Sequence, residues 1–84
     1  MTTKQSETLL IARDLRIILA EVRGRAVPAR TLRYWRSQLG IQPDEMGFYQ
    51  QPQLDVLIGL VKALNQGLNT YQYFELLRQR HGNA

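Results

Sequence analysis

Residues 28–40 read Pro-Ala-Arg-Thr-Leu-Arg-Tyr-Trp-Arg-Ser-Gln-Leu-Gly. The fixed φ of proline suits the first turn of a helix, and glycine readily takes the left-handed conformation that closes one. Leu32, Trp35 and Leu39 follow helical spacing and form one apolar face. The stretch therefore predicts a helix over residues 28–39, closed by the final glycine.

The opposite face of this predicted helix carries polar side chains that suit a nucleic-acid groove. Arginine makes planar, multidentate contacts to phosphates and base edges, and hydroxyl groups add further hydrogen bonds. A solvent-facing amphipathic helix would also carry such residues, and this alternative stays open. The candidate DNA-binding residues are Arg30, Thr31, Arg33, Tyr34, Arg36 and Ser37. Thr31 and Arg36 fall on the flanks of this face.

The chain on the N-terminal side is basic and has helical periodicity. Residues 13–36 hold seven arginines against two acidic residues, a local net charge of +5, whereas the whole chain carries +4 at pH 7. We expect a first helix that begins near Ser6 and is closed by Gly24. Its predicted core-facing stripe consists of Ile11, Leu15, Ile18 and Val22. In the turn that follows, Arg25 is a candidate phosphate contact.

On the C-terminal side, residues 41–50 are rich in turn-forming residues and predict a short wing, formed as a hairpin or a turn. Phe48 and Tyr49 are candidate DNA contacts in this wing. Asp44 and Glu45 make it acidic, which is unfavourable for gripping phosphates.

Two further helices are predicted, over residues 52–66 and 69–80. Asn69 and Gln72 have the spacing of a capping box at the start of the last helix. The apolar residues expected to face the core are Leu54, Leu57, Ile58, Val61 and Leu64 in the third helix, and Phe74, Leu76 and Leu77 in the fourth.

Length and composition limit the function. The 84 residues contain no cysteine and one histidine, and 44% of them are hydrophobic, so we expect one mainly α domain over residues 1–84. The sequence has no glycine-rich phosphate loop and no Cys/His ligand set, so we expect no enzyme activity, no cofactor and no metal site. It also has no apolar run of about 18 residues and no signal pattern. These features predict a cytoplasmic protein without membrane contact.

Several of these positions together resemble the DNA-binding domain of the MerR family. That family opens its recognition helix with a threonine, aliphatic, arginine, aromatic, aromatic motif and closes its wing on a tyrosine. Tyr49, Leu54 and Gly67 also match the family's spacing, at intervals of five and thirteen residues. The matching residues are Thr31-Leu32-Arg33-Tyr34-Trp35, Leu39-Gly40-Ile41, Gly47-Phe48-Tyr49, Leu54, Gly67 and Leu76-Leu77.

The resemblance implies a winged helix-turn-helix fold in which Arg30, Thr31, Arg33 and Tyr34 face the major groove or its phosphates. It covers residues 28–77 and implies a stand-alone, excisionase-like form. Because the sequence ends at Ala84, we expect neither the family's long dimerising helix nor its effector domain.

Two functions therefore stay open. The first is a sequence-specific protein that binds double-stranded DNA, as a small transcriptional regulator or architectural factor, with a homodimer as one form. The second is a protein–protein adaptor or dimerisation module on the same scaffold, supported by surplus apolar surface. The candidate partner surface consists of Leu10, Ile17, Val56, Gly59, Leu60 and Ala63.

Overall fold

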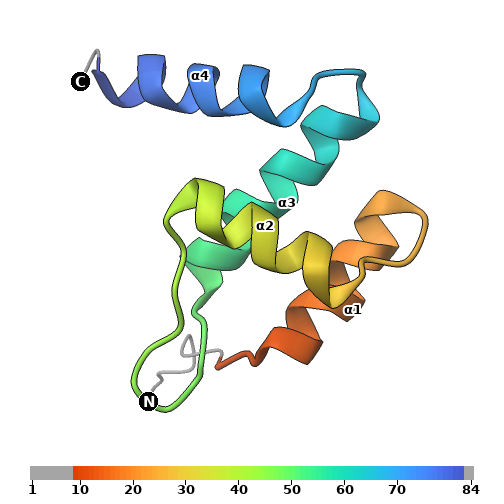
Figure 1. Ribbon diagram of the computed structural model, residues 1–84, viewed down its shortest axis with the longest axis vertical. Coiled ribbons are helices and arrows are strands. Elements are labelled where there is room, and N and C mark those ends of the chain that lie inside the picture. The colour runs from red at the N-terminus through yellow and green to blue at the C-terminus, as the bar shows by residue number, and fades with distance from the viewer. Residues whose placement is uncertain (1–8, 83–84) are drawn as a thin grey trace, which may run out of the picture.

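The computed structural model describes residues 9–82 of the chain (Figure 1). Within this range the protein forms four α-helices and almost no strand. The helices are α1 (Ala12–Arg23), α2 (Ala29–Leu39), α3 (Gln51–Asn65) and α4 (Thr70–Gly82). None of the helices in this range is both long enough and apolar enough to cross a membrane. The prediction of a small, mainly α chain is confirmed.

The segment before α1 is extended, which corrects the predicted helix start. Ser6 lies outside the described residues, but residues 9–11 are described and are not helical. Leu10 forms an antiparallel bridge with Tyr49. The Leu10 amide donates to the Tyr49 carbonyl at 3.0 Å, and the Tyr49 amide donates to the Leu10 carbonyl at 2.6 Å. A helix from Ser6 is therefore wrong for residues 9–11, because their backbone pairs with a segment 39 positions further along the chain.

Helix α1 turns most of the predicted stripe toward the core and adds Leu19 to it. Leu15 and Leu19 are fully buried, and Ile18 and Val22 pack against the core while partly exposed. Ile11 is exposed, because it is the N-cap residue of α1 and has an extended backbone. The stripe thus begins one turn later than the spacing suggests.

Helix α2 follows the sequence prediction closely. Pro28 precedes it as the N-cap residue, and Gly40 closes it at φ 70°. Gly24 closes α1 in the same way, at φ 87°. Both values lie in the left-handed region, where glycine has no Cβ to clash. Leu32 and Trp35 are buried, as expected of the apolar face.

Residues 41–50 form a compact loop without a wing hairpin. The Asp44 carboxylate accepts hydrogen bonds from the amides of Met46 at 2.8 Å and Phe48 at 2.9 Å. The Asp44 amide donates to the Phe48 carbonyl at 2.8 Å. An aspartate that binds its own following backbone in this way stabilises a turn. Within the described chain, the bridge to Leu10 is the loop's strand-like contact.

Helix α4 starts where the capping pattern predicts and packs on α3. The Asn69 amide donates to Gln72 Oε1 at 2.9 Å, and the Gln72 amide donates to Asn69 Oδ1 at 2.8 Å. This reciprocal pair is the expected capping box. Further along α4, the Tyr73 hydroxyl lies over Gly59 of α3 and donates to the Val56 carbonyl at 3.1 Å. The absence of a side chain on Gly59 is what allows this close approach.

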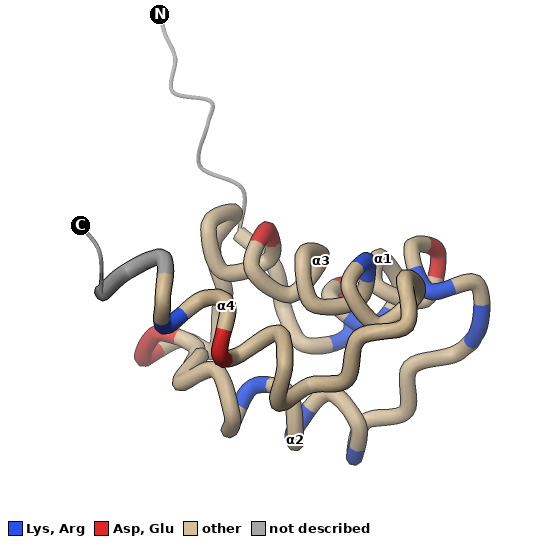
Figure 2. The backbone as a smooth tube through the Cα atoms, turned by 90° about the horizontal axis from the view of Figure 1, so that it is seen from above, with Lys and Arg blue, Asp and Glu red and all other residues tan. Residues whose placement is uncertain are grey.

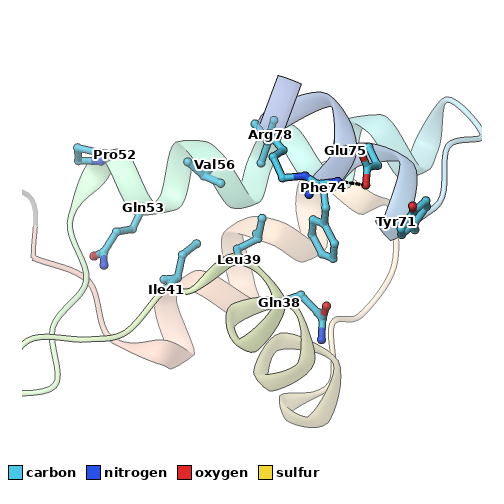
Figure 3. A pocket seen from close by; sticks show the side chains of 11 residues that line it. Gln38, Leu39, Ile41, Pro52, Gln53, Val56, Tyr71, Phe74, Glu75 and Arg78 are labelled. Carbon is cyan, nitrogen blue, oxygen red and sulfur yellow. Dashed lines mark hydrogen bonds and ion pairs between the residues drawn. The ribbon is translucent and has the colours of Figure 1, made fainter. Parts of the chain in front are cut away.

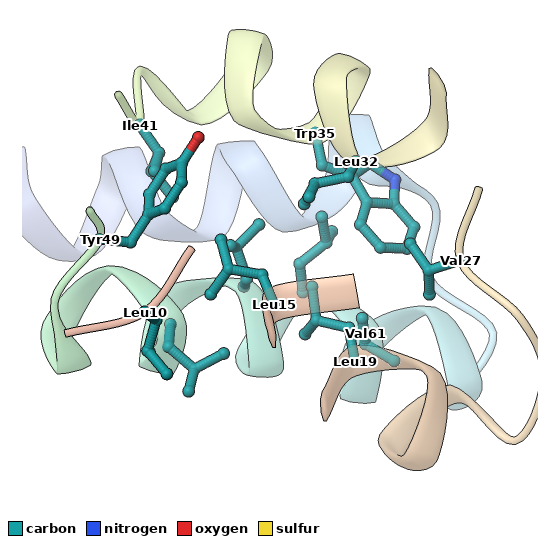
Figure 4. Close-up of a cluster of buried hydrophobic side chains, with 12 residues drawn as sticks. Leu10, Leu15, Leu19, Val27, Leu32, Trp35, Ile41, Tyr49 and Val61 are labelled. Carbon is teal, nitrogen blue, oxygen red and sulfur yellow. The ribbon is translucent and has the colours of Figure 1, made fainter. Parts of the chain in front are cut away.

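The core lies where α1, α2 and α3 meet (Figure 4). Helix α1 packs against α3, and the side chains of Leu32 and Trp35 reach from α2 toward them. The buried cluster consists of Leu10, Leu15, Leu19, Val27, Leu32, Trp35, Ile41, Tyr49, Leu54, Leu57, Leu60 and Val61. Because two large side chains of α2 are held in this core, the opposite side of α2 must face outward.

Much of the predicted partner surface is covered by the chain itself. The buried members are Leu10, Leu60 and Ala63. Gly59 is covered by Tyr73, and Val56 is half-buried. Ile17 stays open, with 53% of its surface exposed. The prediction was therefore wrong for the three buried residues and for Gly59. Helical periodicity assigned no neighbour to these positions, but the core covers the three buried residues and Tyr73 of α4 covers Gly59.

Candidate nucleic-acid interface

The outward side of α2 carries the polar residues expected from the sequence. Arg30, Arg33, Tyr34 and Ser37 are exposed, and Thr31 is half-buried at the flank. Half of the Tyr34 surface is open to solvent. Since the other side of α2 is anchored in the core, this face is fixed in direction and accessible along the length of the helix. We call these five residues the α2 face.

The start of α2 adds a weak attraction for anions. Its N-cap is Pro28, whose side chain forms no capping hydrogen bond. The first amides of a helix have no partner within the helix, and they carry a partial positive charge. Arg30 lies in this first turn. A phosphate oxygen could therefore meet free amides and a guanidinium at the same end of α2.

Two arginines outside α2 hold the turn that leads into it. Arg16 Nε donates to the Val27 carbonyl at 3.0 Å. Arg23 Nη1 donates to the Ala26 carbonyl at 2.8 Å, and its guanidinium lies 5.5 Å from the centre of the Trp35 ring. These bonds tie the α1–α2 turn to α1 and to the buried side of α2. They give both arginines a structural role.

The α1–α2 turn also concentrates positive charge. Burial lowers the pKa of the Arg23 guanidinium, and the nearby charge of Arg25 lowers it further. Arg23 nevertheless stays protonated at neutral pH. Arg25 is exposed and has no hydrogen bond or ion pair with any described residue. An anion bound at this turn would relieve the repulsion between the two guanidinium groups.

Arg36 has a different environment from the rest of the predicted DNA-binding set. Its Nη1 donates to the Tyr49 hydroxyl oxygen at 2.6 Å, and its guanidinium lies 5.7 Å from the centre of the Tyr49 ring. Its Nε is buried without a hydrogen-bond partner. The placement of Arg36 among free DNA contacts is therefore corrected. Its charged group is engaged with the 41–50 loop, and it positions that loop against α2.

The predicted contacts in the wing are also changed. Tyr49 has only 2% of its surface exposed, because its ring lies in the core and its backbone pairs with Leu10. Tyr49 is therefore not available to a phosphate. Phe48 is half-buried. The exposed residues of the loop include Asp44 and Glu45, which would repel a nucleic-acid backbone.

Four arginines remain unengaged by described residues, and these are Arg13, Arg25, Arg30 and Arg33. Within the part of the chain that the structure describes, the one ion pair joins Glu75 and Arg78 of α4. These four arginines therefore have no close acidic partner among the described residues. In Figure 2 the blue segments that mark Lys and Arg lie along α2 and in the turn that precedes it, and also on α1.

The engaged arginines could not have been separated from the free ones by sequence alone. Arg36 lies on the flank of the helical wheel, which hints at partial burial, but its partner is 13 residues away across a loop. Arg23 and Trp35 are joined across a turn whose path the sequence leaves undetermined. Periodicity predicts which side of a helix is outward, whereas these contacts depend on how the loops are folded.

Comparisons with protein-family models, with curated proteins and with solved structures gave no match. The interpretation of the α2 face therefore depends on its geometry and charge.

Proposed function

We propose that this protein binds double-stranded DNA in a sequence-specific way, as a small transcriptional regulator or architectural factor in the cytoplasm. The observation that supports this proposal most is the pair of unengaged arginines, Arg30 and Arg33, on the exposed side of a core-anchored helix. Tyr34 and Ser37 lie on the same side. The major groove of B-DNA is about 12 Å wide and accepts one α-helix.

The α2 face suggests a division of roles among its residues. Arg33 lies in the N-terminal half of α2, and the N-terminal residues of a recognition helix contact base edges in helix-turn-helix proteins. An arginine there can donate two hydrogen bonds to guanine. Arg30, beside the free amides at the helix start, and Arg25 in the preceding turn are better suited to phosphates. Thr31 and Ser37 can add hydroxyl contacts on either side.

The resemblance to the MerR family supports the same arrangement. The motif over residues 31–35 lies on α2, with Leu32 and Trp35 inward and Arg33 and Tyr34 outward. A winged helix-turn-helix is therefore the fold that we propose in finer detail. In this protein the wing would be the 41–50 loop, which Arg36 holds to α2. The carboxylates of Asp44 and Glu45 in this loop would repel DNA phosphates.

DNA binding can be tested by fluorescence anisotropy with a pool of random duplexes at low salt, followed by selection of the bound sequences. On the selected site, Arg33→Ala should weaken binding by about 1–3 kcal/mol and relax the preference at one base position. Lys62→Ala is the matched control, because Lys62 is an exposed cation on α3, outside the α2 face. It removes the same charge and should change affinity little.

The result that would contradict DNA binding is the absence of any complex at low salt. An equal loss of affinity in the Arg33→Ala and Lys62→Ala proteins would instead contradict the assignment of the α2 face.

An adaptor function is the second candidate, and one observation favours it. Tyr71 and Leu76 of α4 are 68% and 50% exposed, although both are large and apolar enough to contribute to an interface. Leu76 was predicted to face the core, and the structure corrects this. An adaptor without DNA readout would keep its partner when Arg33 is replaced by alanine. A DNA-binding protein would lose its preference at one base position of the site.

A further inference from the structure

A groove of about 920 Å³ lies between the end of α2, the first half of α3, and α4 (Figure 3). Most of its lining side chains are apolar, and these include Leu39, Ile41, Val56, Phe74 and Leu77. Its size is at the upper end of the range for ligand pockets. An apolar channel of this size beside a helix can accept one face of another helix.

Helix α4 is only half covered by its own chain. Among its described side chains, none is fully buried. Tyr73 and Phe74 pack against the core cluster, whereas Tyr71 and Leu76 are mostly open. Helices in a folded protein normally cover such apolar residues against a neighbour. Tyr71 lines the groove, whereas Leu76 lies on another side of α4. The exposed surface at Tyr71 is therefore the part of α4 that adjoins the groove.

The charges at the edge of the groove indicate which neighbour would fit. Glu75 and Arg78 both line the groove, three residues apart on α4, and form an ion pair with each other. If a second α4 lies antiparallel across the first, Glu75 of each copy comes opposite Arg78 of the other. The same segment thus supplies both halves of two ion pairs. Self-complementarity of this kind is what a two-fold symmetric interface requires.

We propose that the groove is a homodimer interface, in which α4 of one copy lies antiparallel to α4 of a second copy. In this register the two-fold axis passes between positions 76 and 77, so Leu77 lies nearest the axis, with one Glu75–Arg78 pair on each side of it. Phe74 lies beyond these pairs. The contact is independent of DNA, because no residue of the α2 face lines the groove. From α2 the groove takes only Gln38 and Leu39. A dimer therefore leaves both α2 faces open.

The dimer should be weak. Helix α4 has 13 residues, and so is about 20 Å long, and one helix face is smaller than the roughly 800 Å² per partner of a standard interface. We therefore expect a dissociation constant of about 10–100 μM, in the range of transient complexes. The measurement must cover concentrations above and below this range.

The test uses sedimentation equilibrium on the full chain, from about 5 μM to about 1 mM. The wild type should convert from monomer to dimer over this range. Glu75→Arg and Arg78→Glu should each raise the dissociation constant by about tenfold or more, because each places like charges opposite each other twice. Lys62→Glu, on the exposed side of α3, reverses one charge outside the groove and should leave the equilibrium unchanged. Circular dichroism checks that every variant is folded.

Mixing the two variants separates intermolecular pairing from the pair within one chain. A Glu75→Arg chain is basic at both positions, and an Arg78→Glu chain is acidic at both. Neither has an ion pair of its own, but a mixed dimer has two. An equimolar mixture should therefore form dimers at concentrations where each variant alone stays monomeric. A wild-type protein that is still monomeric at about 1 mM would overturn the proposal. It would also be overturned if both charge-reversal variants dimerised as well as the wild type, or if the equimolar mixture stayed monomeric.

Discussion

At the scale of single residues, Arg36 shows how an arginine on a helix that faces outward can serve the fold. Its contact with Tyr49 joins α2 to the 41–50 loop through one hydrogen bond and one stacked ring. Tyr49→Phe keeps the ring and removes the acceptor, which should lower the free energy of unfolding by about 1 kcal/mol. In a domain of this size that loss lowers the melting temperature by about 4–8 °C. Thermal unfolding followed by circular dichroism measures it.

The control for this prediction lies on the same helix. Arg33 has no partner among the described residues, so Arg33→Lys should leave the melting temperature unchanged. Arg36→Lys should lower it, because an ammonium cannot reproduce the planar contact with the Tyr49 ring. If Arg36→Lys kept full stability and lost DNA affinity instead, Arg36 would be a DNA contact and its structural role would be rejected.

Single residues also show how far the sequence predicts the site. The helical period of 3.6 residues, together with Pro28 and Gly40 at the two ends of the helix, predicts which side chains of α2 point outward. The structure confirms this for Arg30, Arg33, Tyr34 and Ser37. The engagement of Arg36 depends on a contact between distant parts of the chain. Periodicity carries no information about such contacts, so a free and a bonded arginine look alike in the sequence.

At the scale of elements, the contact between α3 and α4 depends on Gly59. A Cβ at this position would lie 2.5 Å from the Tyr73 hydroxyl. Gly59→Ala should therefore displace Tyr73 and its bond to the Val56 carbonyl. Alanine gains up to about 1 kcal/mol of helix propensity, but overpacking costs about 1–3 kcal/mol. We expect a net loss of stability in urea unfolding.

Removal of the Tyr73 hydroxyl should reverse the sign of this effect. In a Tyr73→Phe background the Cβ at position 59 no longer meets an oxygen atom, so Gly59→Ala should raise stability by up to about 1 kcal/mol through helix propensity alone. The two substitutions should thus be strongly non-additive. Additive effects would show that the hydroxyl is not what restricts this position.

Element boundaries were predictable where a local signal sets them. Gly24 and Gly40 close two helices, and the Asn69–Gln72 capping box opens a third. The start of α1 was not predictable, since the residues before it have helical periodicity but pair with Tyr49. A long-range backbone bridge thus overrides the local preference, and the helix begins later than its pattern suggests.

At the scale of the whole molecule, residues 13–36 contain more arginines than are available to contact DNA. Three of the seven arginines in residues 13–36 are bonded within the chain, and these are Arg16, Arg23 and Arg36. Arg25, Arg30 and Arg33 are free on or beside the α2 face, and Arg13 is free on α1. Because Arg33 is assigned to a base edge, we expect two to three phosphate contacts per chain, from Arg25, Arg30 and Arg13.

This number sets the salt dependence of DNA binding. Each neutralised phosphate lowers the slope of log K against log[salt] by about 0.9, so the expected slope per bound chain lies between about −1.8 and −2.7. Affinity should then fall about 12- to 40-fold between 50 and 200 mM salt. If all seven arginines reached phosphates, the fall would be about 6000-fold. Anisotropy titrations at four or more salt concentrations distinguish the two cases. A slope near −6 would mean that the bonded arginines leave their partners on DNA, and that the α1–α2 turn and the 41–50 loop rearrange when the complex forms.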